Sequence, residues 1–216
     1  MKSDLTNNAS INFIYDKVTY NKFKKDIETF EILYNNNFTD QNEKEDFKGI
    51  ISRIINNDTS STFRTFICID RSSSGVVLEY YVRSNCLLIT YIAVSEPNRR
   101  KGLAKQLIES GLKLTSQYIN SVYGKKTDAV FFEANNPIST VSDSFDPNLR
   151  LEIFRKSGCK WIDIEYVQPP LDKQKHKVFN LLLFCYPINH ESGTKLKKTT
   201  IISFLEDFYY ALNIQS

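Results

Sequence analysis

A basic turn at 100–105 holds the residue types with the clearest chemical potential. It belongs to the pattern Arg99-x-x-Gly102-x-Ala104, which follows an apolar run and opens a stretch with helical periodicity. The first amides of a helix lack partners within the helix and carry a partial positive charge, so they can bind an anion. Small residues at Gly102 and Ala104 would let that anion approach the backbone closely. The turn therefore predicts a phosphate site, and a pyrophosphate is the ligand we expect.

Two better-known phosphate loops do not occur in this sequence. It contains no GxxxxGK[ST] pattern and no GxGxxG pattern after an early strand. These absences argue against a Walker-type nucleotide site and a dinucleotide-binding fingerprint. On its local pattern alone, the turn also fits a basic surface turn that caps an ordinary helix, so its meaning depends on the elements around it.

The elements around the turn follow a mixed α/β order. Apolar residues recur at three- and four-residue spacing within 20–56, which predicts two amphipathic helices after a short strand at 11–15. From residue 63, short runs rich in β-branched and aromatic residues replace that period and predict strands. The expected elements from there on are strands at 63–70, 76–82 and 87–94, a helix at 101–118, a strand at 129–133, a helix at 149–156, strands at 161–167 and 178–186, and a closing helix at 201–212.

Length and composition indicate one globular domain spanning 1–216, with its motif-bearing core at about 60–186. The 216 residues are 41 % hydrophobic and 25 % charged, which excludes disordered, collagen-like and coiled-coil classes. The net charge of +3 is too balanced to indicate a nucleic-acid binder, and only the short basic cluster at 98–101 supports one. We expect no nucleic-acid partner.

Targeting and metal-binding signals are also missing from the sequence. No apolar stretch approaches the roughly 18 residues of a membrane span, and the first ten residues hold no signal-peptide run. The four cysteines form no CxxC pair, and no histidine stands at metal-ligand spacing. We therefore expect a soluble, cytoplasmic protein with buried free thiols, no membrane partner and no metal.

The junction from the strand at 87–94 into the turn, with Val94 five residues before Arg99, resembles motif A of the GNAT superfamily of acyl-CoA-dependent N-acyltransferases. The element order is similar to that fold, and Ile153-Phe-Arg-Lys-Ser-Gly158 resembles the family's "LYxxxGF" segment. The resemblance implies a mostly antiparallel sheet, splayed between its fourth and fifth strands, with helices on both faces. It also implies acetyl-CoA as cosubstrate and direct transfer of the acetyl group to a primary amine.

The same resemblance implies a role for each part of the acyl-CoA site. Backbone groups of the fourth strand would pair with the pantetheine arm, and the turn amides would hold the pyrophosphate. An asparagine at the end of the next strand would face the pantetheine, and a main-chain amide near Val94 would stabilise the oxyanion. The implied CoA-binding residues are Ile92, Ala93, Val94, Arg99, Arg100, Lys101, Gly102, Leu103, Ala104, Lys105, Asn135, Asn136 and Phe154.

Two carboxylates are candidates for the catalytic base. Glu133 and Glu79 each stand in an otherwise apolar or aromatic strand, where partial burial would raise the pKa of the carboxyl toward neutrality. Glu133 is favoured by position, because it lies near the end of the strand that opens beside the thioester. A solvent-facing strand position or a structural salt bridge is the alternative interpretation for both residues.

The sequence departs from the family where a tyrosine usually protonates the leaving thiolate, because Phe154 occupies that position. Tyr166 and Tyr91 are candidate replacements, although an aromatic residue at a strand end often only packs. Cys159 follows Gly158 where the family prefers phenylalanine, and we interpret it as a packing residue and not a nucleophile.

The N-acetyltransferase hypothesis has one main competitor, a degenerate acyl-CoA-binding module that senses or scaffolds, with Phe154 marking lost chemistry. The acceptor, a small molecule or a peptidyl amine, stays open because substrate contacts in this fold come from variable loops. A homodimer also stays open, because the apolar closing helix would cover the sheet or a second copy equally well.

Overall fold

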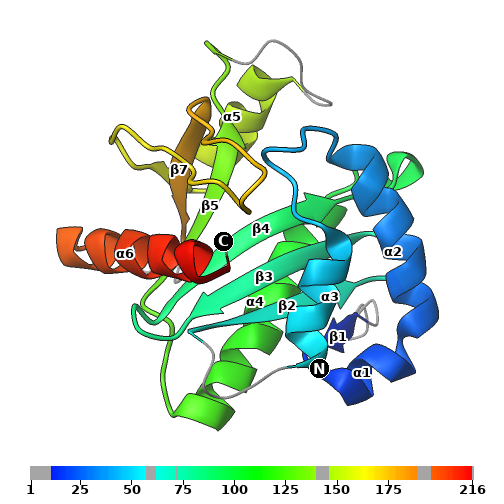
Figure 1. Ribbon diagram of the computed structural model, residues 1–216. Coiled ribbons are helices and arrows are strands. Elements are labelled where there is room, and N and C mark those ends of the chain that lie inside the picture. The colour runs from blue at the N-terminus through cyan, green and yellow to red at the C-terminus, as the bar shows by residue number, and fades with distance from the viewer. Residues whose placement is uncertain (1–10, 57–61, 72, 140–145, 189–195, 216) are drawn as a thin grey trace, which may run out of the picture.

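The chain folds around one seven-stranded sheet with helices on both faces (Figure 1). The computed structural model describes residues 11–56, 62–71, 73–139, 146–188 and 196–215. The strand order is β1-β2-β3-β4-β5-β7-β6, and every neighbouring pair is antiparallel except β4 and β5, which run parallel. The predicted fold class, a mixed α/β fold with a mostly antiparallel sheet, is confirmed.

The elements lie close to the expected ranges. The strands are β1 (Asn12–Ile14), β2 (Phe63–Ile69), β3 (Gly75–Tyr81), β4 (Cys86–Ala93), β5 (Ala129–Asn135), β6 (Lys160–Trp161) and β7 (Leu181–Tyr186). The helices are α1 (Lys17–Lys22), α2 (Lys24–Asn37), α3 (Phe47–Ile55), α4 (Leu103–Tyr123), α5 (Pro147–Lys156) and α6 (Lys198–Gln215), with a short 3₁₀ helix, η1 (Glu96–Asn98). Within the described ranges, no helix is both long and apolar enough to cross a membrane.

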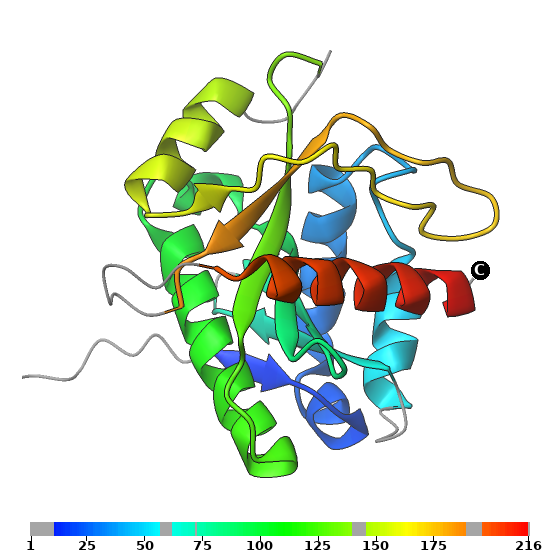
Figure 2. The same cartoon turned by 90° about the vertical axis from the view of Figure 1, so that its left-hand side faces the viewer.

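Alternating side chains divide the sheet into two faces, as the period of a strand requires. On β3, Val76 and Leu78 point into the cluster beneath α4. The same helix comes so near at Gly111 that a Cβ there would lie 3.0 Å from the Leu78 side chain. Val77 and Tyr81 point to the opposite face, which α2, α3 and α6 cover. Figure 2 shows α4 on one side of the sheet and α2 and α3 on the other.

Helix α3 carries one charged side chain toward the sheet. The Asp46 carboxylate accepts a hydrogen bond from the Lys48 amide at the start of this helix, as an N-cap residue does. The apolar face of α3, which includes Ile50 and Ile54, is buried against the sheet. Arg53 lies beside that apolar face, and this position brings its guanidinium over β2 and β3.

The predicted strand at 161–167 is largely absent. Only Lys160 and Trp161 pair with β7, and the chain then leaves the sheet until a single bridge joins Gln168 to Val178. The two prolines at 169–170 have no amide hydrogen to donate, so the ladder cannot continue past Gln168. The departing segment folds over the face that α6 covers and buries Tyr166 there.

Candidate active site

The parallel strands β4 and β5 form a fork. They pair through four rungs, the last of which joins Ile89 to Phe132. Farther along, β5 pairs with β7 and β4 keeps only β3 as a neighbour. Thr90 and Glu133 are therefore the first residues of the two strands beyond the paired segment. This is the splay between the fourth and fifth strands that the resemblance implies.

A bulge in β4 lies at the same point. The register between β3 and β4 shifts so that Val77 pairs with Tyr91 and Leu78 with Ile89, which leaves Thr90 as the extra residue. A bulge breaks the alternation of side chains. As a result Tyr91, three residues after Leu88, packs on the same face of the sheet as Leu88 does.

The turn before α4 has the open backbone that an anion needs. Gly102 has a φ of 79° and Arg100 a φ of 62°, so both adopt the left-handed conformation. A Cβ added to Gly102 would meet no atom within 4 Å, so the space beside this backbone is open. No side chain caps the first turn of α4. The amides of residues 103–105 are therefore available to an oxygen-rich ligand.

Arg99 braces this turn. Its Nε donates to the Val94 carbonyl at 3.2 Å, and its Nη2 donates to the Asn37 side-chain oxygen at 2.6 Å. The guanidinium thus ties the turn to the end of α2, while Arg100 and Lys101 are exposed.

Of the two asparagines at the end of β5, Asn135 belongs to the strand and Asn136 to the turn that follows it. Asn135 pairs with Leu181 in the ladder and, two residues beyond Glu133, lies on the same face of the sheet. The Asn136 amide donates to the Asn180 carbonyl at 2.7 Å, and its side-chain oxygen accepts from the Ile138 amide at 3.1 Å. Asn136 therefore shapes the turn that follows β5.

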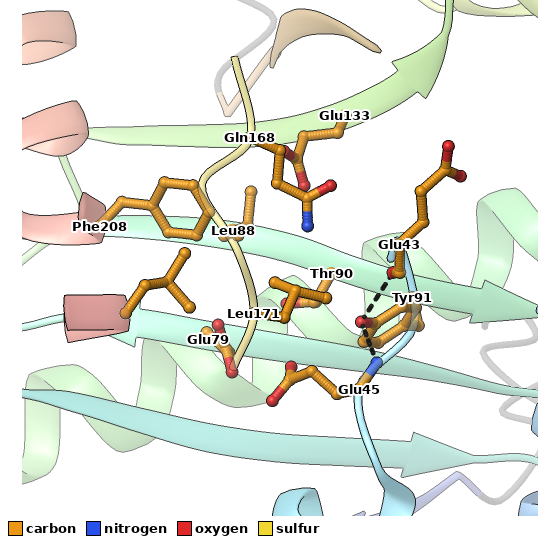
Figure 3. A pocket seen from close by; sticks show the side chains of 11 residues that line it. Glu43, Glu45, Glu79, Leu88, Thr90, Tyr91, Glu133, Gln168, Leu171 and Phe208 are labelled. Atoms are coloured by element: carbon orange, nitrogen blue, oxygen red, sulfur yellow. Dashed lines mark hydrogen bonds between the residues drawn. The ribbon is translucent and has the colours of Figure 1, made fainter. Parts of the chain in front are cut away.

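A small pocket opens beside the fork on the face opposite α4. It lies between the loop before α3, the strands β3 to β5, the segment after β6, and α6 (Figure 3). Its lining residues are Glu43, Glu45, Glu79, Leu88, Thr90, Tyr91, Glu133, Gln168, Leu171, Phe208 and Leu212. Both sequence candidates for the base line this one pocket.

Glu133 and Tyr166 form a hydrogen-bonded pair at the fork. The Tyr166 hydroxyl donates to Oε1 of Glu133. Burial raises the pKa of Glu133 to about 7, and the hydrogen bond from Tyr166 counteracts part of that rise. Oε2 of Glu133 has no hydrogen-bond partner among the described residues, so it can accept a proton from a molecule in the pocket. Burial and the neighbouring Glu133 also raise the pKa of Tyr166, which therefore keeps its proton.

Glu79 is held on both carboxylate oxygens. Its Oε1 accepts from Arg53 at 3.0 Å, and its Oε2 accepts from the Tyr81 hydroxyl at 2.8 Å. Burial raises the pKa of Glu79 to about 7, although the charge of Arg53 opposes this rise. Arg53 also forms a 2.6 Å ion pair with Glu45 and donates to the Thr65 hydroxyl. Glu79 is thus part of the buried network that the sequence analysis gave as the alternative to a base.

Tyr91 holds a loop in place. Its hydroxyl donates to the Glu43 carbonyl at 3.1 Å and accepts from the Glu45 amide at 3.0 Å. These bonds fix the loop before α3 over the pocket, and the Asn180 side chain donates to the Glu43 carboxylate at 3.4 Å. The hydroxyl proton of Tyr91 is therefore committed to the backbone, and its function in the structure is to position this loop.

Phe154 and Cys159 lie on the other face of the sheet. The Phe154 ring packs 4.7 Å from the Phe132 ring and 5.6 Å from the Phe184 ring, between centroids. Cys159 packs against the same cluster, and burial raises the pKa of its thiol to about 12, so it is not a thiolate near neutral pH. An apolar ring therefore occupies the position where the resemblance implies an acid.

Sequence reasoning missed Glu43, Glu45, Arg53 and Gln168. Glu43 and Glu45 belong to a loop with no motif, and Arg53 reads as one polar residue of an amphipathic helix. Among these four residues, only Gln168 has a signal in the sequence, because it stands directly before two prolines. The prolines mark the end of strand pairing, but they do not indicate where the Gln168 side chain points.

A scan of protein-family models and a search of curated proteins find no match to this chain. Solved structures do match. A putative GNAT-family acetyltransferase from Bacteroides thetaiotaomicron superposes with a TM-score of 0.59 and 14 % identity, over 88 % of this chain and 95 % of that one. NAA60 of Arabidopsis thaliana, solved with acetyl-CoA, gives a TM-score of 0.49 and 14 % identity, over 83 % and 99 % of the two chains. At such identities the likeness concerns the fold alone.

Proposed function

We propose that this chain, which has the fold of the GNAT acetyltransferases, transfers an acetyl group from acetyl-CoA to a primary amine. The observation that carries the proposal is the place of Glu133, whose carboxyl, with a pKa of about 7, lies where β4 and β5 part. Acyl transfer to an amine needs a base beside the thioester. By the resemblance, the thioester would lie at this fork.

The described residues fit an acyl-CoA. The open space beside Gly102 and the first amides of α4 suit a pyrophosphate, with Arg100 and Lys101 adding positive charge nearby. The edge at 92–94, formed by the end of β4 and the residue after it, faces the fork and is not paired with β5 there, so it suits the amides of a pantetheine arm. The bound acetyl-CoA would supply the activated thioester. The proposed CoA contacts are those implied by the resemblance, with Arg99 acting as a brace for the turn.

In the proposed reaction Glu133 takes a proton from the incoming ammonium through its unpartnered Oε2. The neutral amine then forms a bond to the acetyl carbon as the carbon–sulfur bond breaks, and a main-chain amide near Val94 donates to the carbonyl oxygen. Tyr166 keeps the Glu133 carboxylate in place by donating to Oε1. Glu79 holds Arg53 and so supports the pocket wall.

The leaving thiolate also needs a proton, and Phe154 cannot give one. A thiol has a pKa of about 8.5, while the pKa of Glu133 is raised to about 7. Transfer of the proton from Glu133 to the thiolate is therefore downhill. We propose that Glu133 gives the thiolate the proton it took from the ammonium, and that the regenerated carboxylate then takes the second proton from the acetylated nitrogen and passes it to water. Tyr166 assists by holding the carboxyl.

The second candidate function is a CoA-binding module without turnover, which the apolar surroundings of Phe154 favour. Calorimetry with acetyl-CoA and a thiol-release assay with a panel of primary amines separate the two. We expect wild type and Glu133→Gln to bind acetyl-CoA in the micromolar range, and only wild type to release CoA rapidly. Binding without turnover on every amine would favour the module, whereas no binding would refute both functions.

A further inference from the structure

We propose that Gln168 and Thr90 hold the attacking amine beside Glu133, and that the pocket accepts this amine only as an ammonium group on an unbranched carbon. The inference rests on the proposed function, because the amine that these residues hold would be the one acetylated. It adds two binding residues and narrows the acceptor to an aminomethyl group, such as the end of a lysine side chain.

A buried amide without a partner is the first observation. Gln168 is 4 % exposed and lines the pocket, and its side chain makes no hydrogen bond to any described residue. Two 3.0 Å backbone hydrogen bonds between Gln168 and Val178 fix the chain at this point. Figure 3 shows the amide group turned into the pocket between Glu133 and Thr90. The Gln168 side chain can therefore present its oxygen to a group that lies beside Glu133.

The Thr90 hydroxyl is the second, independent observation. Its oxygen is buried and has no hydrogen-bond partner among the described residues, and Thr90 lines the same pocket. Thr90 is the extra residue of the bulge in β4, at the point where the two strands part. Buried polar groups in folded proteins are nearly always paired. An unpartnered amide and an unpartnered hydroxyl, on two separate segments of one pocket, therefore point to a polar ligand that both contact.

The kind of these groups suits a primary ammonium. Oε2 of Glu133 is also without a partner among the described residues, so Glu133, Thr90 and Gln168 each offer the ligand one oxygen acceptor. A primary ammonium group has three N–H donors to match them. The bond to the Glu133 carboxylate is charge-assisted and therefore stronger than a bond between neutral groups. An N-methyl group on the amine would leave one buried acceptor without a donor.

The small size of the pocket restricts the carbon that carries the nitrogen. Leu88, Leu171 and Leu212 add apolar surface to the lining, and a methylene group next to the ammonium can pack on them. A second carbon branch at that position would push against packed side chains, which is costly in a protein interior. An aminomethyl group therefore fits the pocket, whereas the α-amino group at most peptide N-termini stands on a branched carbon.

The first test measures amine binding without any transfer. Thermal unfolding of the whole protein would be followed in the chlorides of ethylamine, N-methylethylamine and isopropylamine, at equal millimolar concentrations. A cation that binds only the folded protein raises its unfolding midpoint. We expect ethylammonium to raise the midpoint above that in the other two salts, because one cation lacks the third N–H and the other has a branched carbon. The same midpoint in ethylammonium and in either other salt would overturn the inference.

Two variants show whether the polar groups bind the amine or serve the fold. Gln168→Met and Thr90→Val should each weaken ethylammonium binding by about tenfold or more, since each removes a hydrogen bond to a charged group. Each should leave the stability of the free protein unchanged or raised, because the buried group it removes has no partner among the described residues. Reduced stability with unchanged ethylammonium binding, as expected of groups that hold a structural water, would refute the inference.

Thr115→Val is the matched control. The Thr115 hydroxyl is likewise buried without a partner among the described residues, but it lies on the buried face of α4 and outside the pocket lining. The variant should leave ethylammonium binding as in wild type.

Assays with acetyl-CoA separate this inference from the proposed function. In the thiol-release assay we expect kcat/KM for ethylamine to exceed that for N-methylethylamine by at least about a hundredfold, because a site built to hydrogen-bond its substrate rejects an analogue that lacks the donor. Comparable values would leave acetyl transfer standing and refute the selection. Selective binding of ethylammonium by a protein that does not bind acetyl-CoA would do the reverse.

Discussion

Two glutamates with the same raised pKa have different roles, because their hydrogen bonds differ. Burial brings the pKa of both Glu79 and Glu133 to about 7. Both oxygens of Glu79 are occupied, by Arg53 and Tyr81, whereas Oε2 of Glu133 is open to the pocket. Ionisation alone would not distinguish them, and the unoccupied oxygen is the reason why we propose Glu133, and not Glu79, as the base.

Substitution of Glu133 by glutamine should lower kcat/KM by about 10²- to 10⁴-fold, the usual contribution of a general base. The base must be ionised, so wild-type activity should rise with pH through about 7 and fall below it. The pH–rate profile of Glu133→Gln should lack this rise through about pH 7. Deprotonation of the amine substrate raises the rate with pH in both proteins alike, so it does not account for the difference. A wild-type pH profile parallel to that of the variant would contradict the assignment.

Removal of the Tyr166 hydroxyl should raise the pKa of Glu133, because the hydrogen bond from Tyr166 favours the charged carboxylate. Tyr166→Phe should therefore shift the acidic limb of the pH–rate profile upward, by as much as about one pH unit, and activity should recover at higher pH. Tyr80→Phe, whose hydroxyl bonds Asn85, is the control. An unshifted limb with reduced activity throughout would show that Tyr166 acts in another way.

Among the elements, helix α4 is flanked by two glycines in the left-handed conformation, and only one of them lies at the proposed anion site. Gly102 begins the helix at a φ of 79° and Gly124 ends it at a φ of 63°, and added Cβ atoms would meet nothing at either position. The backbone strain of a substitution is therefore similar at both ends. Only the N-terminal glycine lies where the helix amides would face an anion.

Gly102→Ala and Gly124→Ala should thus cost similar stability, about 1 kcal/mol each, because both force a Cβ into the left-handed region. Only Gly102→Ala should weaken acetyl-CoA binding, by about tenfold or more, because its methyl group enters the space beside the amides. Thermal unfolding and calorimetry together check this. Equal acetyl-CoA affinities in the two variants would place the pyrophosphate elsewhere.

At the scale of the whole molecule, Arg53 joins parts of the chain that are far apart in sequence. From α3 it reaches Glu45 in the preceding loop, Thr65 on β2 and Glu79 on β3. The carboxylates of this group are largely buried, with side-chain exposures of 12 % for Glu45 and 6 % for Glu79. Arg53 therefore stabilises the wall of the pocket and the fold at the same time.

Arg53→Met should destabilise the protein by about 3–5 kcal/mol, because it leaves buried carboxylates without a partner. The folded-state pKa of Glu79 lies above the ordinary carboxyl value, so its cost is small when it is protonated and grows as pH rises toward and past 7. Urea unfolding should accordingly show a larger loss at about pH 8 than at about pH 5.

Two further variants test the same explanation. The double variant Arg53→Met/Glu79→Gln should recover part of the lost stability, because it removes one unpaired charge. Arg155→Met, an exposed position on α5, should change stability by less than about 0.5 kcal/mol. Wild-type stability in Arg53→Met would contradict the structural role of the network.

Much of the fold could be predicted because it follows from local signals. The periods of the apolar residues gave the order of helices and strands, and the basic turn after the fourth strand gave the resemblance that the GNAT fold now confirms. The exception is the strand expected at 161–167, where residues of strand type leave the sheet to bury Tyr166 over the fork.

Residue type and spacing along the chain were enough to identify the phosphate turn, the two candidate glutamates and the phenylalanine at the position where the resemblance implies a tyrosine. The hydrogen bond from Tyr166 to Glu133, the ion pair of Arg53 with Glu79, and the common pocket of Glu43, Glu45 and Gln168 could be found only in the folded chain. Hydrogen bonds and pKa values depend on which groups lie within a few ångströms in space, and sequence spacing does not give that distance. Residues 43, 133 and 168 come together only when the strands part and two distant loops close over them.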